Sequence, residues 1–221
     1  MTTLTTAPLR PLLDRLFDEA DAADAATVAA FAGLSDAERA RLMQSKTDYR
    51  ELYGRLKTVP LAVSRETGAL LYMLARGCRA RTIVEFGTSF GISTLHLAAA
   101  LRDNGGGRLI TSEFEPSKAA RARENLAAGG LIDLVDIREG DALATLSVDL
   151  PETVDLLLLD GAKALYPDIL SLAERHLKPG AFIVADNADY SPDYLAHVRA
   201  PANGYMSVAF GEDVELSMRI G

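Results

Sequence analysis

From residue 81 onward the sequence alternates short apolar runs with amphipathic stretches, and this alternation limits the fold more than any other feature. The apolar runs are TIVEFG, GRLITSEFE, LVDIREGD, TVDLLLLD and GAFIVADN, and a helical pattern separates each run from the next. Parallel strands need such crossover connections, which are almost always right-handed. Near-continuous apolar strands are typical of a sheet that helices cover on both faces. The pattern therefore predicts an α/β fold with a doubly wound, mostly parallel sheet.

The two ends of the chain depart from this alternation. The C-terminal GYMSVAFGEDVELSMRIG predicts two strands with a turn at Gly211–Glu212 and no helix between them, hence an antiparallel hairpin at the sheet edge and seven strands in all. Residues 1–57 predict extra helices, and Ser35 followed by Glu38 has the pattern of a capping box. We expect a main domain over residues 58–221. The N-terminal helices would cap the sheet, form a lid or make a dimer contact.

Charge and composition exclude several classes of partner. The 221 residues carry a formal net charge of −8, which disfavours non-specific binding to nucleic acid or to anionic lipid. The single cysteine, Cys78, predicts a reduced thiol rather than a disulfide. We see neither a secretory signal pattern nor an apolar run of transmembrane length. We therefore expect a soluble, cytoplasmic protein without a nucleic-acid or membrane partner.

Polar residues follow all five predicted parallel strands. They are Glu85, Glu113, Asp141, Asp160 and the pair Asp186–Asn187. In an open sheet of this kind, ligands bind beyond the carboxyl ends of the strands. Repetition at five successive ends favours a shared acidic rim over chance.

The first strand-to-helix turn, VEFGTSFGIS, predicts a nucleotide-type ligand. Gly87 and Gly91 allow a tight turn and close approach of a ligand, although a tight turn alone would explain them equally well. The spacing differs from the G-x-G-x-x-G of nicotinamide enzymes and so disfavours an oxidoreductase. Glu113 is placed to accept both hydroxyls of a ribose. Asp141 and Ala142 are expected beside an adenine, and the alternative for Asp141 is a helix N-cap.

These segments resemble a known family. VEFGTSFGIS, ITSEFEP and REGDA are similar to the S-adenosylmethionine-binding motifs of class I methyltransferases, which have a Rossmann-like fold. LLLLDGAK and ADNADYSPDYLAHVR resemble the catechol and caffeoyl-CoA O-methyltransferases, and the resemblance covers about residues 58–221. It implies that S-adenosylmethionine is bound by Glu85, Gly87, Ser93, Glu113, Asp141, Ala142 and Asp160.

The resemblance also implies a metal site and a catalytic pair. In this family a divalent cation, usually magnesium, is held by residues that correspond to Asp160, Asp186 and Asn187, and oxygen ligands of this kind suit magnesium. Lys163, three residues after Asp160, corresponds to the base. That role requires a pKa below the ordinary value of about 10.4, which burial and a nearby cation would favour. A homodimer is common in the family and is expected here.

The predicted function is S-adenosylmethionine-dependent methylation of a hydroxyl on a small molecule with vicinal hydroxyls. The alternatives are a metal-independent small-molecule O- or N-methyltransferase and a non-catalytic S-adenosylmethionine-binding protein. The chain lacks tryptophan and has Gly161 and Ala162 where the resembling enzymes carry bulky residues. A larger or differently shaped acceptor than catechol is therefore expected, in a pocket lined by Tyr190, Tyr194 or Tyr205.

Overall fold

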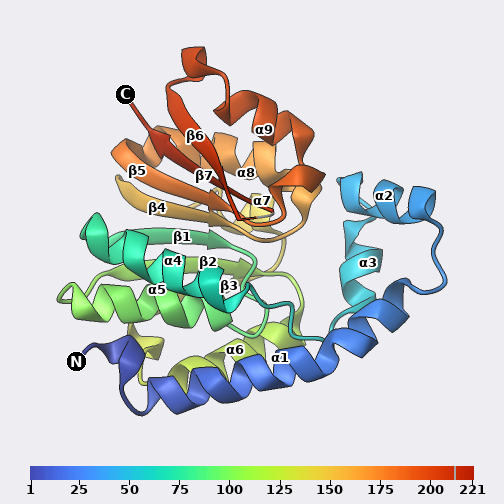
Figure 1. Ribbon diagram of the computed structural model, residues 1–221. Helices are drawn as coiled ribbons and strands as arrows, with labels where there is room; N and C mark the ends of the chain where they lie inside the picture. The colour runs from blue at the N-terminus through green and yellow to red at the C-terminus, as the bar shows by residue number, and fades with distance from the viewer. Residues whose placement is uncertain (212) are drawn as a thin grey trace.

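The computed structural model has one sheet of seven strands in the order β3-β2-β1-β4-β5-β7-β6 (Figure 1). The strands are β1 (Thr82–Phe86), β2 (Arg108–Glu113), β3 (Val135–Glu139), β4 (Val154–Leu159), β5 (Leu177–Ala185), β6 (Tyr205–Phe210) and β7 (Val214–Arg219). β1 to β5 are parallel, and β7 runs antiparallel to both β5 and β6. This confirms the predicted fold class, including the antiparallel edge.

The structure describes residues 1–211 and 213–221, without the side chains of residues 24–31 and 36. Glu212, in the predicted hairpin turn, lies outside these residues.

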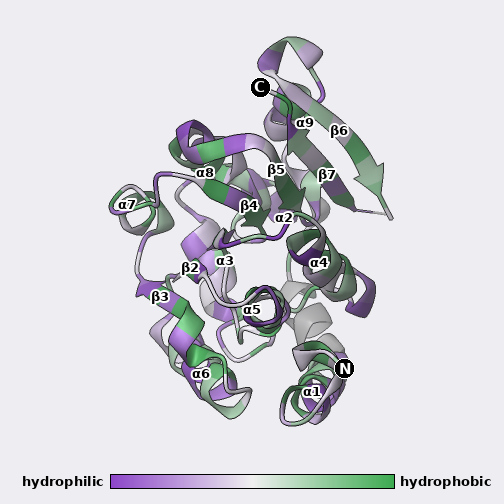
Figure 2. Cartoon of the chain, turned by 90° about the vertical axis from the view of Figure 1, so that its left-hand side faces the viewer, coloured by the Kyte–Doolittle hydropathy of each residue, from purple (hydrophilic) through white to green (hydrophobic). Residues whose placement is uncertain are grey.

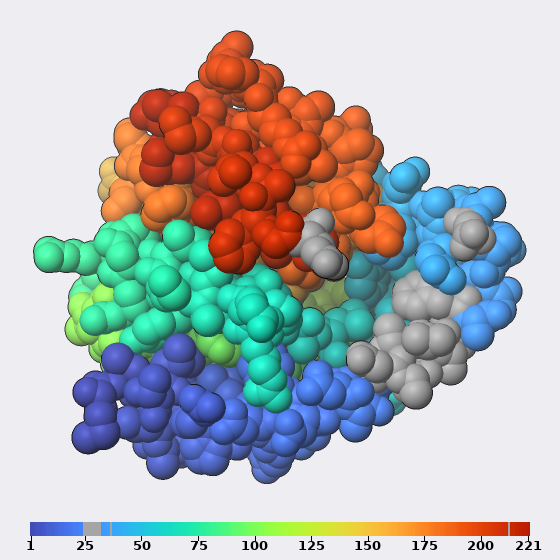
Figure 3. Space-filling view, viewed as in Figure 1, coloured from blue at the N-terminus to red at the C-terminus, as the bar shows by residue number. Residues whose placement is uncertain are grey.

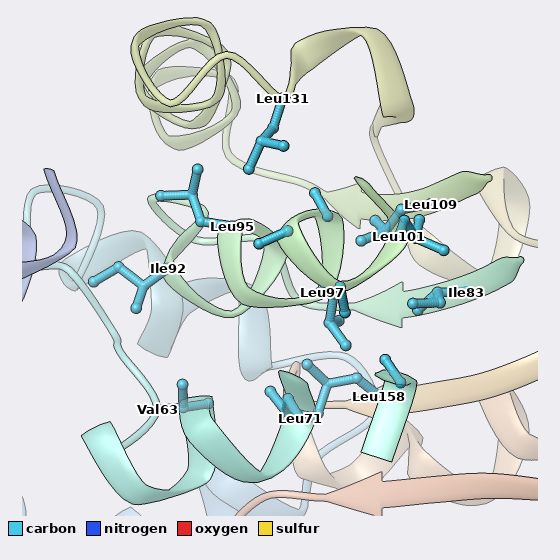
Figure 4. Packing of buried hydrophobic residues seen from close by; sticks show 14 of the residues in the cluster. Val63, Leu71, Ile83, Ile92, Leu95, Leu97, Leu101, Leu109, Leu131 and Leu158 are labelled. Carbon is cyan, nitrogen blue, oxygen red and sulfur yellow. The ribbon is translucent and has the colours of Figure 1, made fainter. Parts of the chain in front are cut away.

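Helices cover both faces of the sheet because side chains of successive strand residues alternate in direction. Ile83 and Leu158 point to one face, where they join a core with α4 (Arg65–Gly77), α5 (Ile92–Asp103) and α6 (Pro116–Ala128) (Figure 4). Val84 and Leu157 point to the other face, toward α7 (Ala142–Thr145), α8 (Tyr166–Ala173) and α9 (Pro192–Val198). The remaining 3-10 turns are η2 (Ile132–Leu134), η3 (Lys163–Leu165), η4 (Glu174–His176), η5 (Ala188–Tyr190) and η6 (Pro201–Asn203).

The four leucines of β4 occupy the centre of the sheet. β4 lies between β1 and β5 and is coloured as strongly hydrophobic in Figure 2. Leu156 to Leu159 are fully buried, two toward each core. Burial of a leucine side chain contributes roughly 1.5–3 kcal/mol before entropy is counted. The strand end at Asp160 is therefore held rigidly by packing on both faces.

The N-terminal helices leave the sheet and approach its carboxyl end. After η1 (Thr3–Thr5), α1 (Leu9–Phe31) packs on the α5 side of the fold, and α2 (Asp36–Gln44) and α3 (Tyr49–Arg55) stand beyond the tips of the parallel strands (Figure 1). Ser35 and Glu38 form the predicted capping box, in which the Glu38 carboxylate accepts from the Ser35 N–H at 2.9 Å. None of the described helices combines the length and hydropathy that a bilayer span requires.

Candidate active site

A cavity, the inner cavity, lies beyond the carboxyl ends of β1, β2 and β4. From β1 the chain connects to β2 on one side, and β4 lies on the other, so this is the point where the strand order reverses. Ligands bind at such points in open α/β sheets. Four of the predicted cofactor residues line the inner cavity, namely Gly87, Glu113, Ala142 and Asp160.

Gly87 makes the close approach of β1 and β4 possible. Its φ is +104°, and a Cβ there would lie 2.5 Å from the Asp160 carbonyl oxygen. The loop that follows is fixed by Glu113, whose carboxylate accepts from the backbone N–H of Ser89 at 2.8 Å and of Glu115 at 3.0 Å. Burial raises the pKa of Glu113, and these hydrogen bonds oppose the rise. One carboxylate thus orders the rim of the cavity.

Glu85 and Ser93 lie behind the inner cavity and do not line it. The Glu85 carboxylate is fully buried and accepts from Ser93 Oγ and Thr94 Oγ1, each at 2.6 Å. Burial raises its pKa to about 7, although the hydroxyl donors oppose this. These contacts tie β1 to the first turn of α5. Both residues therefore support the loop around Gly87 from beneath.

Asp141 also lies outside the lining, whereas its neighbours Gly140 and Ala142 belong to it. The Asp141 side chain accepts from the Leu143 N–H at 2.9 Å, so the N-cap alternative is confirmed. Its other oxygen pairs with Arg50 of α3 at 2.6 Å. Asp141 thus joins the start of α7 to the N-terminal helices.

A second and larger space, the outer hollow, lies on the other side of Asp160 and is open to solvent. It encloses about 540 Å³, and Figure 3 shows the surface hollowed between the N-terminal helices in blue and the C-terminal part in orange and red. Its polar residues include Asp160, Lys163, Asp186 and Asn187, which follow β4 and β5. Asp160, Tyr53 and Leu61 line both spaces. The structure therefore brings the predicted metal ligands and the predicted base together.

Lys163 is 4% exposed and sits in a hydrogen-bonded chain. Its Nζ donates to Asp160 Oδ1 at 3.1 Å and to the Tyr166 hydroxyl at 2.8 Å, and that hydroxyl donates to the Asp186 carbonyl oxygen at 2.8 Å. The role of a base requires a pKa below the ordinary value. Burial lowers the pKa of Lys163, but its neighbours, foremost Tyr166 and Asp160, together raise it by more, so without a bound cation its pKa lies well above the ordinary value.

The donor set around Asp160 suits a hard cation. Burial, and then the neighbouring Asp160 carboxyl, raise the pKa of Asp186 to about 8, so two carboxyls compete here for negative charge that a cation would stabilise. Asn187 has a left-handed φ of 46°, and its Nδ2 donates to Asp213 at 2.7 Å, which leaves the amide oxygen as a ligand. Among the described residues no three His, Cys, Asp or Glu side chains form a metal site. Two carboxylates and one amide match the preference of magnesium for few protein ligands.

Two expectations about the acceptor pocket change. Gly161 and Ala162 line the inner cavity, not the outer hollow, and a Cβ at Gly161 would come within 2.4 Å of the Phe86 ring. The prediction that Tyr190, Tyr194 or Tyr205 lines the acceptor pocket is wrong. Tyr194 and Tyr205 are at most 2% exposed within the second core, and Tyr190 lines a separate surface depression. The Phe86 ring occupies the space that a side chain at Gly161 would fill.

Sequence reasoning missed several residues of the lining, and three of these come from helices. Tyr49 and Tyr53 come from α3, a helix without a recognisable motif, and the Tyr53 hydroxyl donates to the Gly161 carbonyl at 3.3 Å. Lys118 of α6 is 4% exposed, lines the inner cavity and lies 5.8 Å from the centre of the Phe90 ring. Burial lowers its pKa. Its position five residues after Glu113 was the only available signal.

Comparisons with known proteins agree with this arrangement. Residues 84–188 match the family model of a methyltransferase domain. A catechol O-methyltransferase from Niastella koreensis is 40% identical over 130 residues, which cover 58% of this chain and 58% of that protein. The chain thus spans a little under three fifths of the first curated relatives that it matches. A catechol O-methyltransferase from Sus scrofa is 33% identical over 145 residues, covering 62% of this chain and 77% of that protein.

A solved structure extends the likeness. An O-methyltransferase of tomaymycin synthesis from Streptomyces achromogenes, in complex with S-adenosylmethionine, is 30% identical with a TM-score of 0.67. The alignment covers 83% of this chain and 88% of that one. With the reversed strand order, the glycine turn and the polar strand ends, these matches place the chain in a family. The chain belongs to the class I S-adenosylmethionine-dependent O-methyltransferases of the catechol and caffeoyl-CoA type.

Proposed function

We propose that this protein transfers the methyl group of S-adenosylmethionine to one hydroxyl of a small molecule with vicinal hydroxyls, and that a divalent cation, Mg²⁺, assists. The observation that supports this most is that the inner cavity and the outer hollow meet at Asp160. A methyl donor in one and an acceptor in the other would face each other across that side chain. Such positioning is a large part of what an enzyme contributes to a group transfer.

The inner cavity is assigned to the methyl donor. Glu113 has a carboxylate at the cavity wall that can accept from ribose hydroxyls, while Gly87 lets the backbone approach the ligand. Phe114 and Ala142 offer apolar surface for an adenine ring. Glu85 and Ser93 support the loop from beneath.

The outer hollow is assigned to the acceptor and the cation. Asp160, Asp186 and Asn187 would hold the ion, which supplies positive charge that favours deprotonation of an acceptor hydroxyl. Asp213 orients Asn187 through its Nδ2. Lys163, fixed by Asp160 and Tyr166, stands where its ammonium can stabilise negative charge on the acceptor oxygen. It could receive the hydroxyl proton only if a bound cation lowered its pKa.

The N-terminal helices of residues 1–57 are assigned the role of a cap over both spaces. Arg50 pairs with Asp141 at 2.6 Å and Tyr53 donates to Gly161 at 3.3 Å, in the loops after β3 and β4, while Lys46 pairs with Asp168 of α8 at 2.6 Å. Just beyond these helices, the Leu61 N–H donates to Ser89 Oγ, in the loop after β1, at 3.2 Å. Contacts to three different loops would close the site from outside. Water exclusion of this kind strengthens electrostatic interactions within a site.

A chelator experiment tests the proposal. With S-adenosylmethionine and a catechol probe, excess EDTA should reduce transfer by at least about 100-fold, and added Mg²⁺ should restore it. Asp186→Ala should show the same loss without rescue, whereas Asp193→Ala, at an exposed position of α9, should retain activity. Binding of S-adenosylhomocysteine, measured by calorimetry, should persist in EDTA. Full activity in EDTA would instead support the metal-independent alternative, and binding without transfer to any diol would support the non-catalytic one.

A further inference from the structure

The wall of the outer hollow indicates the kind of molecule that it accepts. We propose that the acceptor carries, beyond its vicinal hydroxyls, an elongated, uncharged and apolar body that the N-terminal helices enclose. This inference rests on the proposed function, because it names the acceptor class of the same site.

The hollow has two chemically different sides. Asp160, Lys163, Asp186 and Asn187 form its polar floor. The opposite wall is apolar and comes from α1, α2, α3 and the segment after them, through Phe17, Met43, Leu52, Leu56, Leu61 and Val63. A ligand that satisfies both sides must itself have a polar end and an apolar end.

This apolar wall is packed against the rest of the protein. Leu52 is 1% exposed and Leu56 is 2% exposed, so α3 already has neighbours on most of its apolar side. Lys46, before α3, pairs with Asp168 of α8, and Tyr53 donates to the Gly161 carbonyl. A pre-formed wall binds an apolar group at a lower entropy cost than a mobile one would.

The volume of the hollow exceeds what a single dihydroxyphenyl ring needs. It encloses about 540 Å³, within the range of about 300–1000 Å³ that is typical of ligand pockets. A bare catechol would reach the floor and leave uncovered the accessible part of the apolar wall, to which the half-buried Met43 and Leu61 contribute. Each additional methylene group that the wall buries should improve binding by up to about 4-fold.

Charges at the hollow exclude one class of elongated acceptor. Asp21, Arg65 and Glu66 belong to the lining. The positive charge of Arg65 is already paired, since its guanidinium lies 3.2 Å from Asp18 and 3.9 Å from Asp21. The same group stands 4.4 Å from the centre of the Phe17 ring. The remaining negative charge would repel an anionic tail such as the phosphates of an acyl-CoA thioester. A cationic body would lose its hydration against the apolar wall, so the body of the acceptor is uncharged.

A series of acceptors tests this inference. With S-adenosylmethionine and Mg²⁺, kcat/KM should rise by at least about 30-fold from catechol to 4-butylcatechol, because four methylene-sized groups leave water. Met43→Asp should lower kcat/KM for 4-octylcatechol by about 10-fold more than it lowers kcat/KM for catechol. Met73→Asp, at a 67% exposed methionine of α4, is the matched control and should change neither. A chain that ends in a carboxylate should be at least about 10-fold worse than its methyl ester.

The outcomes separate this inference from the proposed function. A kcat/KM that is the same for all chain lengths, or a carboxylate-tipped chain as good as its ester, would overturn the apolar, uncharged acceptor and leave the methyltransferase proposal intact. Failure of every diol to accept a methyl group, with S-adenosylhomocysteine bound normally, would overturn both.

Discussion

The inner cavity and the outer hollow each contain a lysine that is 4% exposed, yet the two side chains differ in charge preference. Lys118 of the inner cavity has a lowered pKa because burial dominates. Lys163 of the outer hollow has a pKa well above the ordinary value, since Tyr166 and Asp160 outweigh the effect of burial. Equal burial of the two lysines therefore does not give equal pKa shifts. The immediate neighbours decide in which direction the pKa of a buried lysine moves.

The contacts explain the difference. Lys163 donates two hydrogen bonds, to Asp160 and to Tyr166. The Lys118 ammonium makes no hydrogen bond or ion pair with any residue that the structure describes, and Glu113 and Glu115 act on it only at longer range. An ammonium without partners at a cavity wall can still be satisfied by a ligand. Lys163 is thus held in place by the protein itself, and Lys118 has donors left for a ligand.

Replacement of Lys163 should have the largest effect. Lys163→Met should lower kcat by about 10²–10⁴-fold and leave the Kd of S-adenosylhomocysteine within a few-fold. Lys163→Arg separates two roles, because an arginine keeps the charge but stays protonated. If Lys163 accepts the proton, the arginine variant should be as slow as the methionine variant, and if it stabilises charge, part of the rate should return. A methionine variant with nearly normal kcat would remove Lys163 from the mechanism.

Replacement of Lys118 should have a smaller effect, confined to the inner cavity. Lys118→Met should weaken S-adenosylhomocysteine binding by about 10-fold, the size of one hydrogen bond to a charged donor, with kcat at saturation little changed. Lys57→Met, at an exposed lysine, is the control. Calorimetry with the 2′-deoxy and 3′-deoxy analogues shows whether the ammonium contacts the ribose. The analogue that lacks the contacted hydroxyl should bind both proteins equally, and normal binding by Lys118→Met would make the lysine structural.

The difference between the two spaces also shows what the sequence could predict. The alternation of strands and helices shows where each strand ends, and ligands bind at those ends in parallel sheets. This is how the sequence indicated Gly87, Glu113 and Ala142. The same reasoning placed Asp160 and Asp186 on neighbouring strand ends. Residues that arrive from distant elements gave no such signal. Tyr53 and the apolar wall of the hollow depend on how α3 packs across the strand tips, which local periodicity does not encode.

Side-chain roles were harder to predict than positions. Glu85 stands at a strand end like Glu113, yet its carboxylate turns under the loop to Ser93 and Thr94. A position at the end of a strand does not distinguish Glu85 from Glu113. A carboxylate finds hydrogen-bond donors whether it turns toward the cavity or under the loop. From the sequence, we used Gly161 to infer the shape of the acceptor. In the structure, the absence of a side chain at Gly161 makes room for the Phe86 ring. The decisive facts in both cases are three-dimensional contacts.

Asp155, outside both spaces, shows how a buried carboxylate contributes to stability when it has no ligand role. Asp155 is the second residue of β4, whereas Asp160 follows the last residue of that strand. Asp155 pairs with Lys178 and accepts from the backbone N–H groups of Arg81 at 2.6 Å and Thr82 at 2.9 Å. Burial would raise the pKa of Asp155, but Lys178 and these N–H groups lower it below its ordinary value of 3.8. The contact joins β1, β4 and β5 at the end opposite the candidate site.

Asp155→Asn should therefore reduce stability without changing either cavity. We expect a loss of about 1–2 kcal/mol at pH 7, a fall in Tm of about 2–8 °C, with kcat and the Kd of S-adenosylhomocysteine unchanged. Because folding lowers the pKa of Asp155, its contribution is complete above the unfolded value and is lost as the pH falls through the folded value. The Tm difference between wild type and variant should stay constant from about pH 7 to pH 5 and close below about pH 4. A difference that persists in acid would assign the effect to packing rather than to charge, and a change in kcat would show that the strand start and the strand end are coupled.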